Sequence, residues 1–249
     1  MSESVRVLFV GPAGRTGRAT GAALDRMPGL EIVGAVGHQS AGRDLGELWH
    51  GQRDGREIYA DVGSAMAALR PDVLCDFTKA EVAEAHLRLA LWAGVRPVIG
   101  TTGISDAALR EAAALCRDRG IPGAVIANFS IVAWLLERLA LLTQPYFDGV
   151  ELIELHAAAK LDKPSGTARR LKRLLEEQGE REVPVHSVRL PGLVAHQEVL
   201  LGSQGEVLTL RHDALDRSCY AAGLRLCILG LGQAEGLVTD LGRFLPPLS

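Results

Sequence analysis

The sequence predicts an α/β protein in two parts. A doubly wound, Rossmann-like parallel sheet comes first, and an α+β domain with a largely antiparallel sheet follows it. Three observations predict this. Short apolar runs alternate with helical patterns through the first half of the chain, a glycine-rich turn follows the first of these runs, and strand patterns succeed one another after residue 180.

The first half has the alternation of strands and helices that builds a parallel sheet. The run Val5–Val10 is apolar without a break, as in a strand that is buried on both faces. Residues 17–27 carry Ala19, Ala22, Ala23 and Met27 on one helical face. By the same criteria we expect further strands at 31–36, 73–77, 97–99 and 123–127, and further helices at 61–69, 80–93 and 105–119. Ser105 or Asp106 is the expected cap of the last helix.

The pattern changes after Asn128. An apolar helix is expected at 131–143 and a basic-faced helix at 167–178, and strands are expected at 149–156, 185–189, 194–201 and 207–212. The tail is apolar again, over 221–231 and 236–242. We therefore expect a first domain of residues 1–128, completed by 220–249, and a second domain of residues 129–219.

Composition excludes several classes of protein. The 249 residues have a formal net charge of −3 and only 4% aromatic residues, which argues against a general nucleic-acid binder. No pair of cysteines has C-x-x-C spacing, and no His/Asp/Glu cluster has metal-ligand spacing, so we expect no metal site. The chain shows neither a signal-peptide pattern nor an apolar run long enough to span a membrane. The expected protein is soluble and cytoplasmic.

A glycine-rich turn follows the first strand and opens the first helix. It consists of Gly11, Pro12, Ala13, Gly14, Arg15, Thr16 and Gly17, with the spacing G-x-x-G-x-x-G. Glycines allow a tight turn and let a pyrophosphate approach the backbone N–H groups at a helix N-terminus. Arg15 or Arg18 could add bonds to phosphate. A strand-to-helix turn without a ligand is the alternative interpretation.

The second strand lacks the acidic residue that usually bonds the ribose of NAD. It ends instead at Gly37-His38-Gln39-Ser40. A carboxylate there would repel a 2′-phosphate, so its absence favours NADPH, with His38, Gln39, Ser40 or Arg43 as candidate donors. We expect NADPH to be accepted at least as well as NADH.

Two more loops lie at the expected carboxyl ends of strands, where ligands bind in open α/β sheets. Gly100, Thr101 and Thr102 form one, and Ala127, Asn128 and Phe129 form the other. Their small and polar residues suit a close approach to a nicotinamide. Ordinary loop chemistry would explain either loop taken alone.

The segment from Glu154 to Ala168 carries the other candidate chemistry. It places His156 and Lys160 before a Ser165-Gly166-Thr167 turn that begins a helix. An imidazole can deliver a proton, and a helix N-terminus can bind a carboxylate. Alone, His156 would be a structural histidine and Lys160 a solvated charge.

Together these motifs resemble the 4-hydroxy-tetrahydrodipicolinate reductase (dihydrodipicolinate reductase) family of bacterial lysine and diaminopimelate synthesis. The most specific match is K-x-D-x-P-S-G-T-A, which runs from Lys160 to Ala168, and other matches follow in order along nearly the whole chain. The resemblance implies a dinucleotide-binding first domain, a second domain for substrate binding and oligomerisation, and a homotetramer.

The resemblance also implies a reaction. A cyclic imine dicarboxylate binds between the two domains, and NADPH or NADH delivers hydride to its ring. His156 matches the family's proton donor, Lys160 the cation that holds the substrate, and Ser165, Gly166 and Thr167 the turn that binds a carboxylate.

One departure from the family leaves two alternatives open. The family has a second histidine after the proton donor, where this chain has Ala157, and Lys163 stands where alanine is usual. A paralogue that reduces a different cyclic imine is therefore the first alternative. A dinucleotide-binding sensor without turnover is the second, although retention of both His156 and Lys160 speaks against it.

Overall fold

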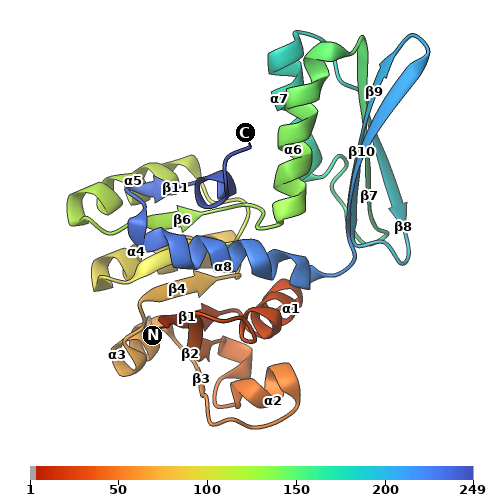
Figure 1. Ribbon diagram of the computed structural model, residues 1–249. Coiled ribbons are helices and arrows are strands. Elements are labelled where there is room, and N and C mark those ends of the chain that lie inside the picture. The colour runs from red at the N-terminus through yellow and green to blue at the C-terminus, as the bar shows by residue number, and fades with distance from the viewer. Residues whose placement is uncertain (1–3, 249) are drawn as a thin grey trace. The chain divides into compact units, whose positions relative to one another are not determined.

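The computed structural model describes residues 4–248 (Figure 1). The chain divides into two compact units. The first unit contains the described residues up to Ser130 together with those from Arg217 onward, and the second unit contains Ile131–Asp216. Each unit has a sheet and a core of its own.

A parallel sheet of seven described strands forms the centre of the first unit, in the order β11-β6-β5-β4-β1-β2-β3. The bounds of these strands are β1 Val5–Val10, β2 Leu30–Val36, β3 Ile58–Tyr59, β4 Val73–Asp76, β5 Arg96–Ile99, β6 Gly123–Val125 and β11 Leu237–Val238. Because β11 pairs with β6, the C-terminal segment returns to this sheet. The order reverses at β1, which lies between β4 and β2.

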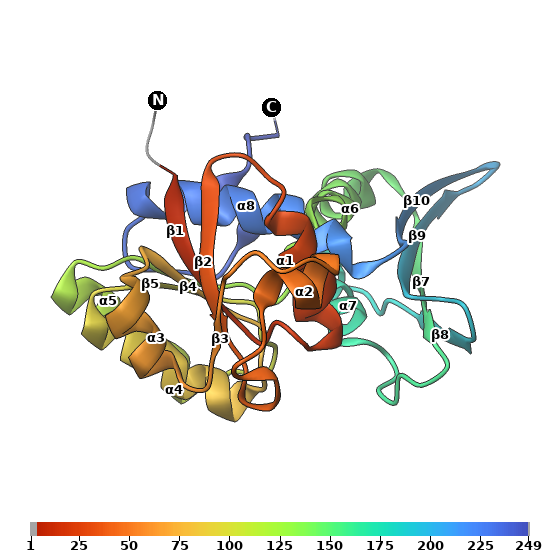
Figure 2. The same cartoon turned by 90° about the horizontal axis from the view of Figure 1, so that it is seen from below.

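Helices cover both faces of this sheet (Figure 2). One face carries α3 (Val62–Leu69), α4 (Ala80–Ala93) and α5 (Asp106–Arg119), and the other carries α1 (Arg15–Leu24) and α8 (Ala221–Gly230). Strand alternation divides the buried side chains between the faces. Leu8 and Val10 belong to the core under α3, α4 and α5, so Val7 and Phe9 point to the other face.

The first unit departs from the predicted elements at two places. Helix α1 begins at Arg15 and ends at Leu24, so it lies earlier in the chain than the predicted 17–27. Residues 38–59 contain elements that the sequence did not predict: a 3-10 turn at His38–Ser40, helix α2 (Leu45–His50) and strand β3. Helix α2 has six residues and β3 has two, which is too few for either element to show a hydrophobic period.

The second unit has a sheet of four strands in the order β10-β9-β7-β8. Their bounds are β7 Gly149–Ala157, β8 Val185–Leu190, β9 Ala195–Ser203 and β10 Glu206–Ala214. Only the β7–β8 pair is parallel, so the sheet is largely antiparallel. Helices α6 (Ile131–Thr143) and α7 (Gly166–Gly179) pack on it through an aliphatic core. The predicted fold class is confirmed in both units.

No helix within residues 4–248 combines the length and the apolar character that crossing a membrane requires.

Candidate active site

The glycine turn between β1 and α1 depends on the glycines at its two ends. Gly11 has a φ of +84°, a conformation that favours glycine. A Cβ at Gly17 would lie 2.0 Å from the carbonyl oxygen of Gly11, which no side chain tolerates. The turn is closed by bonds from the N–H of Gly11 to the Val36 carbonyl (2.9 Å) and from the N–H of Gly14 to the Gly11 carbonyl (3.3 Å). Gly17 thus lets α1 pack directly on the turn.

The N-terminus of α1 is open to an anion. Its cap residue Gly14 has no side chain to accept from the first-turn amides, and the first turn contains no acidic residue. Ala13, Gly14 and Arg15 are exposed. The amides of Arg15, Thr16 and Gly17 are therefore the donors that a helix start leaves unpaired. This arrangement fits the pyrophosphate of a dinucleotide.

The end of β2 offers fewer donors than the sequence indicated. His38, Gln39 and Arg43 are exposed, but Ser40 is buried, and its hydroxyl donates to the Gly37 carbonyl at 3.3 Å. The 2′-phosphate candidates that remain accessible are His38, Gln39 and Arg43.

A buried carboxylate, Asp76 at the end of β4, organises the loop that precedes α4. It accepts from the N–H and the hydroxyl of Thr78, both at 2.7 Å, and it contacts His86 Nδ1 at 2.6 Å. Thr101 is also buried, and its hydroxyl donates to the Thr78 carbonyl at 3.1 Å. Thr102 is exposed. The predicted loop 100–102 is thus joined to the β4–α4 loop. The part that His86 takes in this network could not be predicted, because the histidine lies within a helix and belongs to no motif.

The third predicted loop, residues 127–129, has its aromatic side chain turned inward. Ala127 is exposed, and the side chain of Asn128 accepts from the N–H of Ser130 at 2.9 Å. Phe129 is only 2% exposed, and its ring lies 6.1 Å from that of Phe77. The aromatic side chain therefore belongs to the core and is not available to a ligand.

In the second unit, His156 lies beside a buried carboxylate. Glu154 and His156 are two apart in β7, so strand alternation puts both side chains on one face. His156 Nδ1 is 2.5 Å from Glu154 Oε2, and Arg189 on β8 donates to the other carboxylate oxygen at 2.6 Å. The β7–β8 register places His156 directly opposite Arg189. Sequence reasoning assigned no role to Glu154 or Arg189.

The charges around His156 set its proton affinity. Burial lowers the pKa of His156 below its ordinary value, the positive charges of Lys160 and Arg189 lower it further, and Glu154 opposes them. Burial alone would raise the pKa of Glu154, but hydrogen bonds from Arg189 and Ser187 and the charge of His156 hold it below its ordinary value. Glu154 is therefore ionised, and it accepts a hydrogen bond from the proton-bearing Nδ1 of His156. Nε2 is left as the nitrogen that can exchange a proton with a ligand.

Lys160 lies where its charge acts on His156 and where a ligand can reach it. Its backbone N–H donates to the Ala157 carbonyl at 3.0 Å, which closes the turn after β7. Its ammonium contacts Asp162 at 2.7 Å, and both side chains are about a third or more exposed. Because an exposed pair of this kind is weak, an anionic ligand can compete for the ammonium.

The turn before α7 resembles the turn before α1 in its use of a helix start. Ser165 is buried and caps α7, its hydroxyl accepting from the N–H of Ala168 at 3.2 Å. Gly166 and Thr167 are exposed, and the first turn of α7 contains no acidic residue. The structure thus commits the oxygen of Ser165 to the helix and leaves Gly166 and Thr167 open to a carboxylate.

Profile and sequence comparisons decide which family this geometry belongs to. Residues 5–129 match the profile described as dihydrodipicolinate reductase, N-terminus, and residues 129–245 match the corresponding C-terminus profile. The chain belongs to the dihydrodipicolinate reductase family. It is 43% identical over 245 residues to the 4-hydroxy-tetrahydrodipicolinate reductase of Symbiobacterium thermophilum, covering 96% of each chain. It is 36% identical to that of Bacillus subtilis, covering 98% of this chain and 99% of the relative.

A solved dihydrodipicolinate reductase has the same fold. The dipicolinate-bound enzyme from Paenisporosarcina sp. TG-14 is 32% identical to this chain and has a TM-score of 0.84. The match covers 98% of this chain and 100% of the solved chain. An amine dehydrogenase from Mycobacterium smegmatis shares the fold alone, with 16% identity and a TM-score of 0.71. As a member of the dihydrodipicolinate reductase family, the chain is an oxidoreductase with a Rossmann-type NAD(P)-binding domain. Within residues 4–248, no group of three or more His, Cys, Asp or Glu side chains could hold a metal ion.

Proposed function

We propose that this protein uses NADPH or NADH to reduce 4-hydroxy-tetrahydrodipicolinate to tetrahydrodipicolinate in lysine and diaminopimelate biosynthesis. The observation that carries the proposal is the Arg189–Glu154–His156 arrangement beside Lys160. It holds one imidazole nitrogen on a buried carboxylate and leaves the other for proton transfer, next to a cation suited to a dicarboxylate. The full-length relatives that carry this enzyme name support the same substrate.

The residues of the second unit would manage the charge that the reaction creates. The 4-hydroxyl group of the substrate must leave as water, which makes the ring a conjugated imine. A nicotinamide bound in the first unit would supply a hydride to the ring carbon that carried the hydroxyl, and the negative charge that then reaches the ring nitrogen would take up a proton. His156 Nε2 is the group that we assign to deliver it. The lowered pKa of His156 makes its proton easier to give up. Lys160 and the first-turn amides of α7 would hold the substrate carboxylates.

The first unit would hold the dinucleotide. Gly11, Gly14 and Gly17 shape the turn, and the uncapped start of α1 would bind the pyrophosphate. We assign the loops at 100–102 and 127–129 to the nicotinamide. The end of β2 has no acidic side chain over 37–40, so we propose that NADPH is accepted at least as well as NADH. A kcat/KM ratio that strongly favours NADH would overturn this preference.

The loss of NADPH absorbance with freshly prepared 4-hydroxy-tetrahydrodipicolinate tests the reaction. We expect turnover by the wild type. His156→Gln should lower kcat by at least a hundredfold while the affinity for NADPH stays the same, because general acid catalysis contributes about 10²- to 10⁴-fold. His186→Gln is the matched control, since His186 lies on the neighbouring strand β8 and pairs with Glu151 on the exposed surface. Equal kcat in the two variants would remove His156 from the mechanism.

Ala157 favours a second candidate, a paralogue that reduces a different cyclic imine. Alanine provides no hydrogen-bond donor where the family has a second histidine. NADPH binding without turnover of the dipicolinate-type substrate, followed by turnover of another cyclic imine from a panel, would establish the paralogue.

We further propose a cytoplasmic homotetramer assembled through the sheet of the second unit. Large apolar side chains on its edge strands support assembly there: Leu190 on β8 is 54% exposed and Val207 on β10 is 68% exposed. All four cysteines are free thiols, which suits a reducing compartment. Light scattering on the eluting protein would measure the mass of the assembly, and a mass other than four chains would overturn the tetramer.

A further inference from the structure

Helix α2, which the sequence did not predict, contacts the glycine turn through Trp49. The indole is 8% exposed, and its N–H donates to the carbonyl oxygen of Pro12 at 3.1 Å. Its ring meets Phe9 edge to face, with the centroids 5.2 Å apart. A Cβ at Gly21 would come within 2.4 Å of the ring, so the indole lies directly on α1. Trp49 therefore joins α2 to both the turn and the helix that the turn opens.

The carbonyl that Trp49 holds controls the direction of a neighbouring amide. The C=O of Pro12 and the N–H of Ala13 belong to one peptide plane, and in a trans peptide the two groups point in opposite directions. Pro12 is buried and Ala13 is exposed. Holding the Pro12 carbonyl inward against the buried indole therefore directs the Ala13 N–H away from the indole, toward the exposed side of the turn.

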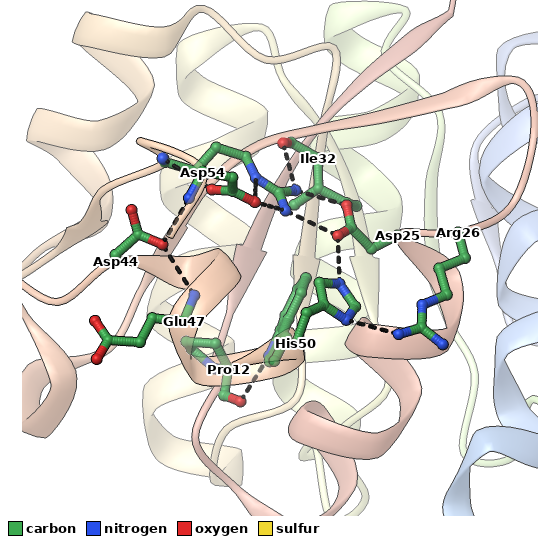
Figure 3. A network of polar contacts seen from close by, with 10 residues as sticks. Pro12, Asp25, Arg26, Ile32, Asp44, Glu47, His50 and Asp54 are labelled. Atoms are coloured by element: carbon green, nitrogen blue, oxygen red, sulfur yellow. Dashed lines mark hydrogen bonds and ion pairs between the residues drawn. The ribbon is translucent and has the colours of Figure 1, made fainter. Parts of the chain in front are cut away.

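A charge network anchors α2 so that Trp49 stays in place (Figure 3). Asp25, just after α1, accepts two bonds from Arg56, at 2.6 and 2.8 Å, and its Oδ2 lies 2.8 Å from His50 Nε2. At the other end of α2, Asp44 accepts from the N–H groups of Glu47 and Gly55 at 2.9 and 2.8 Å. The bidentate Arg56 pair fixes the orientation of the Asp25 carboxylate. Because His50 in the last turn of α2 contacts that carboxylate, the end of α2 is tied to the end of α1.

We propose that Trp49 is a positioning residue for the pyrophosphate of the dinucleotide. It preorganises the turn through its bond to Pro12, without touching the cofactor's reacting atoms. The inference rests on the proposed function, because it requires a dinucleotide at this turn. When the bond is lost, the turn spends a smaller fraction of its time in the binding-competent form. The apparent Kd is the intrinsic Kd divided by that fraction, so it rises.

Calorimetric titration of the full chain with NADPH and with ADP-ribose tests the proposal. Trp49→Phe keeps an aromatic ring and removes only the donor. We expect Kd to rise about fivefold for both ligands, because this is the change in affinity that the loss of one net hydrogen bond produces. The kcat at saturating NADPH should be unchanged. ADP-ribose lacks the nicotinamide but keeps the pyrophosphate, so a shared increase places the effect at the turn. Trp92→Phe is the control, since Trp92 is 60% exposed on α4.

The outcomes separate this inference from the proposed function. Unchanged Kd values in a folded Trp49→Phe protein would overturn the positioning role, and so would a fall in kcat with Kd unchanged. A wild type that binds neither ligand would instead overturn the proposed function. If Trp49→Phe does not fold, Arg56→Lys serves as the second variant, because it weakens the anchor of α2 and leaves the indole intact. It should raise both Kd values, and unchanged values would again overturn the proposal.

Discussion

Replacing Glu154 by glutamine changes the charge next to His156 while keeping the shape of the side chain. Glu154 is the group that raises the pKa of His156 against the effects of burial, Lys160 and Arg189. Its removal must therefore lower that pKa. A hydrogen bond to a charged group contributes about 1.5–3 kcal/mol, and one pKa unit corresponds to about 1.36 kcal/mol. We expect the pKa of His156 to fall by about one to two units in Glu154→Gln.

The sign of the effect on activity follows from the role that we propose for His156, that of a proton donor. The donating form is lost as pH rises through its pKa, so the alkaline limb of kcat/KM should move to lower pH by the same one to two units. At a pH above both pKa values, the variant should be about 10- to 100-fold slower than the wild type. At a pH below both, the two rates should converge.

The assay is kcat/KM for the imine substrate across the pH range, with Glu151→Gln as the control. Glu151 lies on the same strand, but it pairs with His186 where both side chains are more than half exposed. The variant also leaves Arg189, whose side chain is 6% exposed, without its carboxylate. Because breaking a buried pair costs about 3–5 kcal/mol, the measurements belong well below the lowered Tm. Superimposable pH profiles for Glu154→Gln and Glu151→Gln would refute the reasoning.

Three other substitutions test separate parts of the structure. Gly17→Ala would press a methyl group against the Gly11 carbonyl oxygen and so displace the turn. Because overpacking costs about 1–3 kcal/mol, the Kd for NADPH measured by calorimetry should rise about 10- to 100-fold. An unchanged Kd would show that the turn does not hold the cofactor. Ala157→His should lower KM for the dipicolinate-type substrate if the site is otherwise the family's, and steady-state kinetics would show an unchanged or higher KM if another imine is the substrate. Asp76→Asn should lower the free energy of unfolding in urea by about 1–3 kcal/mol, because the buried contact with His86 is weakened. Asp118→Asn, on the exposed surface of α5, should have little effect, and equal losses in the two variants would contradict the role given to Asp76.

Features that depend on short stretches of chain could be predicted from the sequence. Helices α4 and α6 have the predicted bounds, 80–93 and 131–143, because each presents a long apolar period with a clear end. The strand–turn–helix at Gly11–Gly17 could be predicted for the same reason, since its glycines are needed within a single turn of backbone. Helix α2 could not be predicted, because six residues give no hydrophobic period and because its last residue, His50, contacts Asp25, which lies far before it along the chain.

The side chains that support the candidate site come from distant parts of the sequence, and no spacing rule reveals them. Arg189 reaches Glu154 only because β8 pairs in parallel with β7, in a register that sets Arg189 opposite His156. Trp49 reaches Pro12 only because Gly21 lets an indole lie on α1. In both cases the motif supplies the group that we propose to meet the ligand, and a residue distant in the sequence holds that group or the peptide next to it. A motif copied onto another sheet without these partners would keep its residues and lose the orientation of its imidazole and its amides.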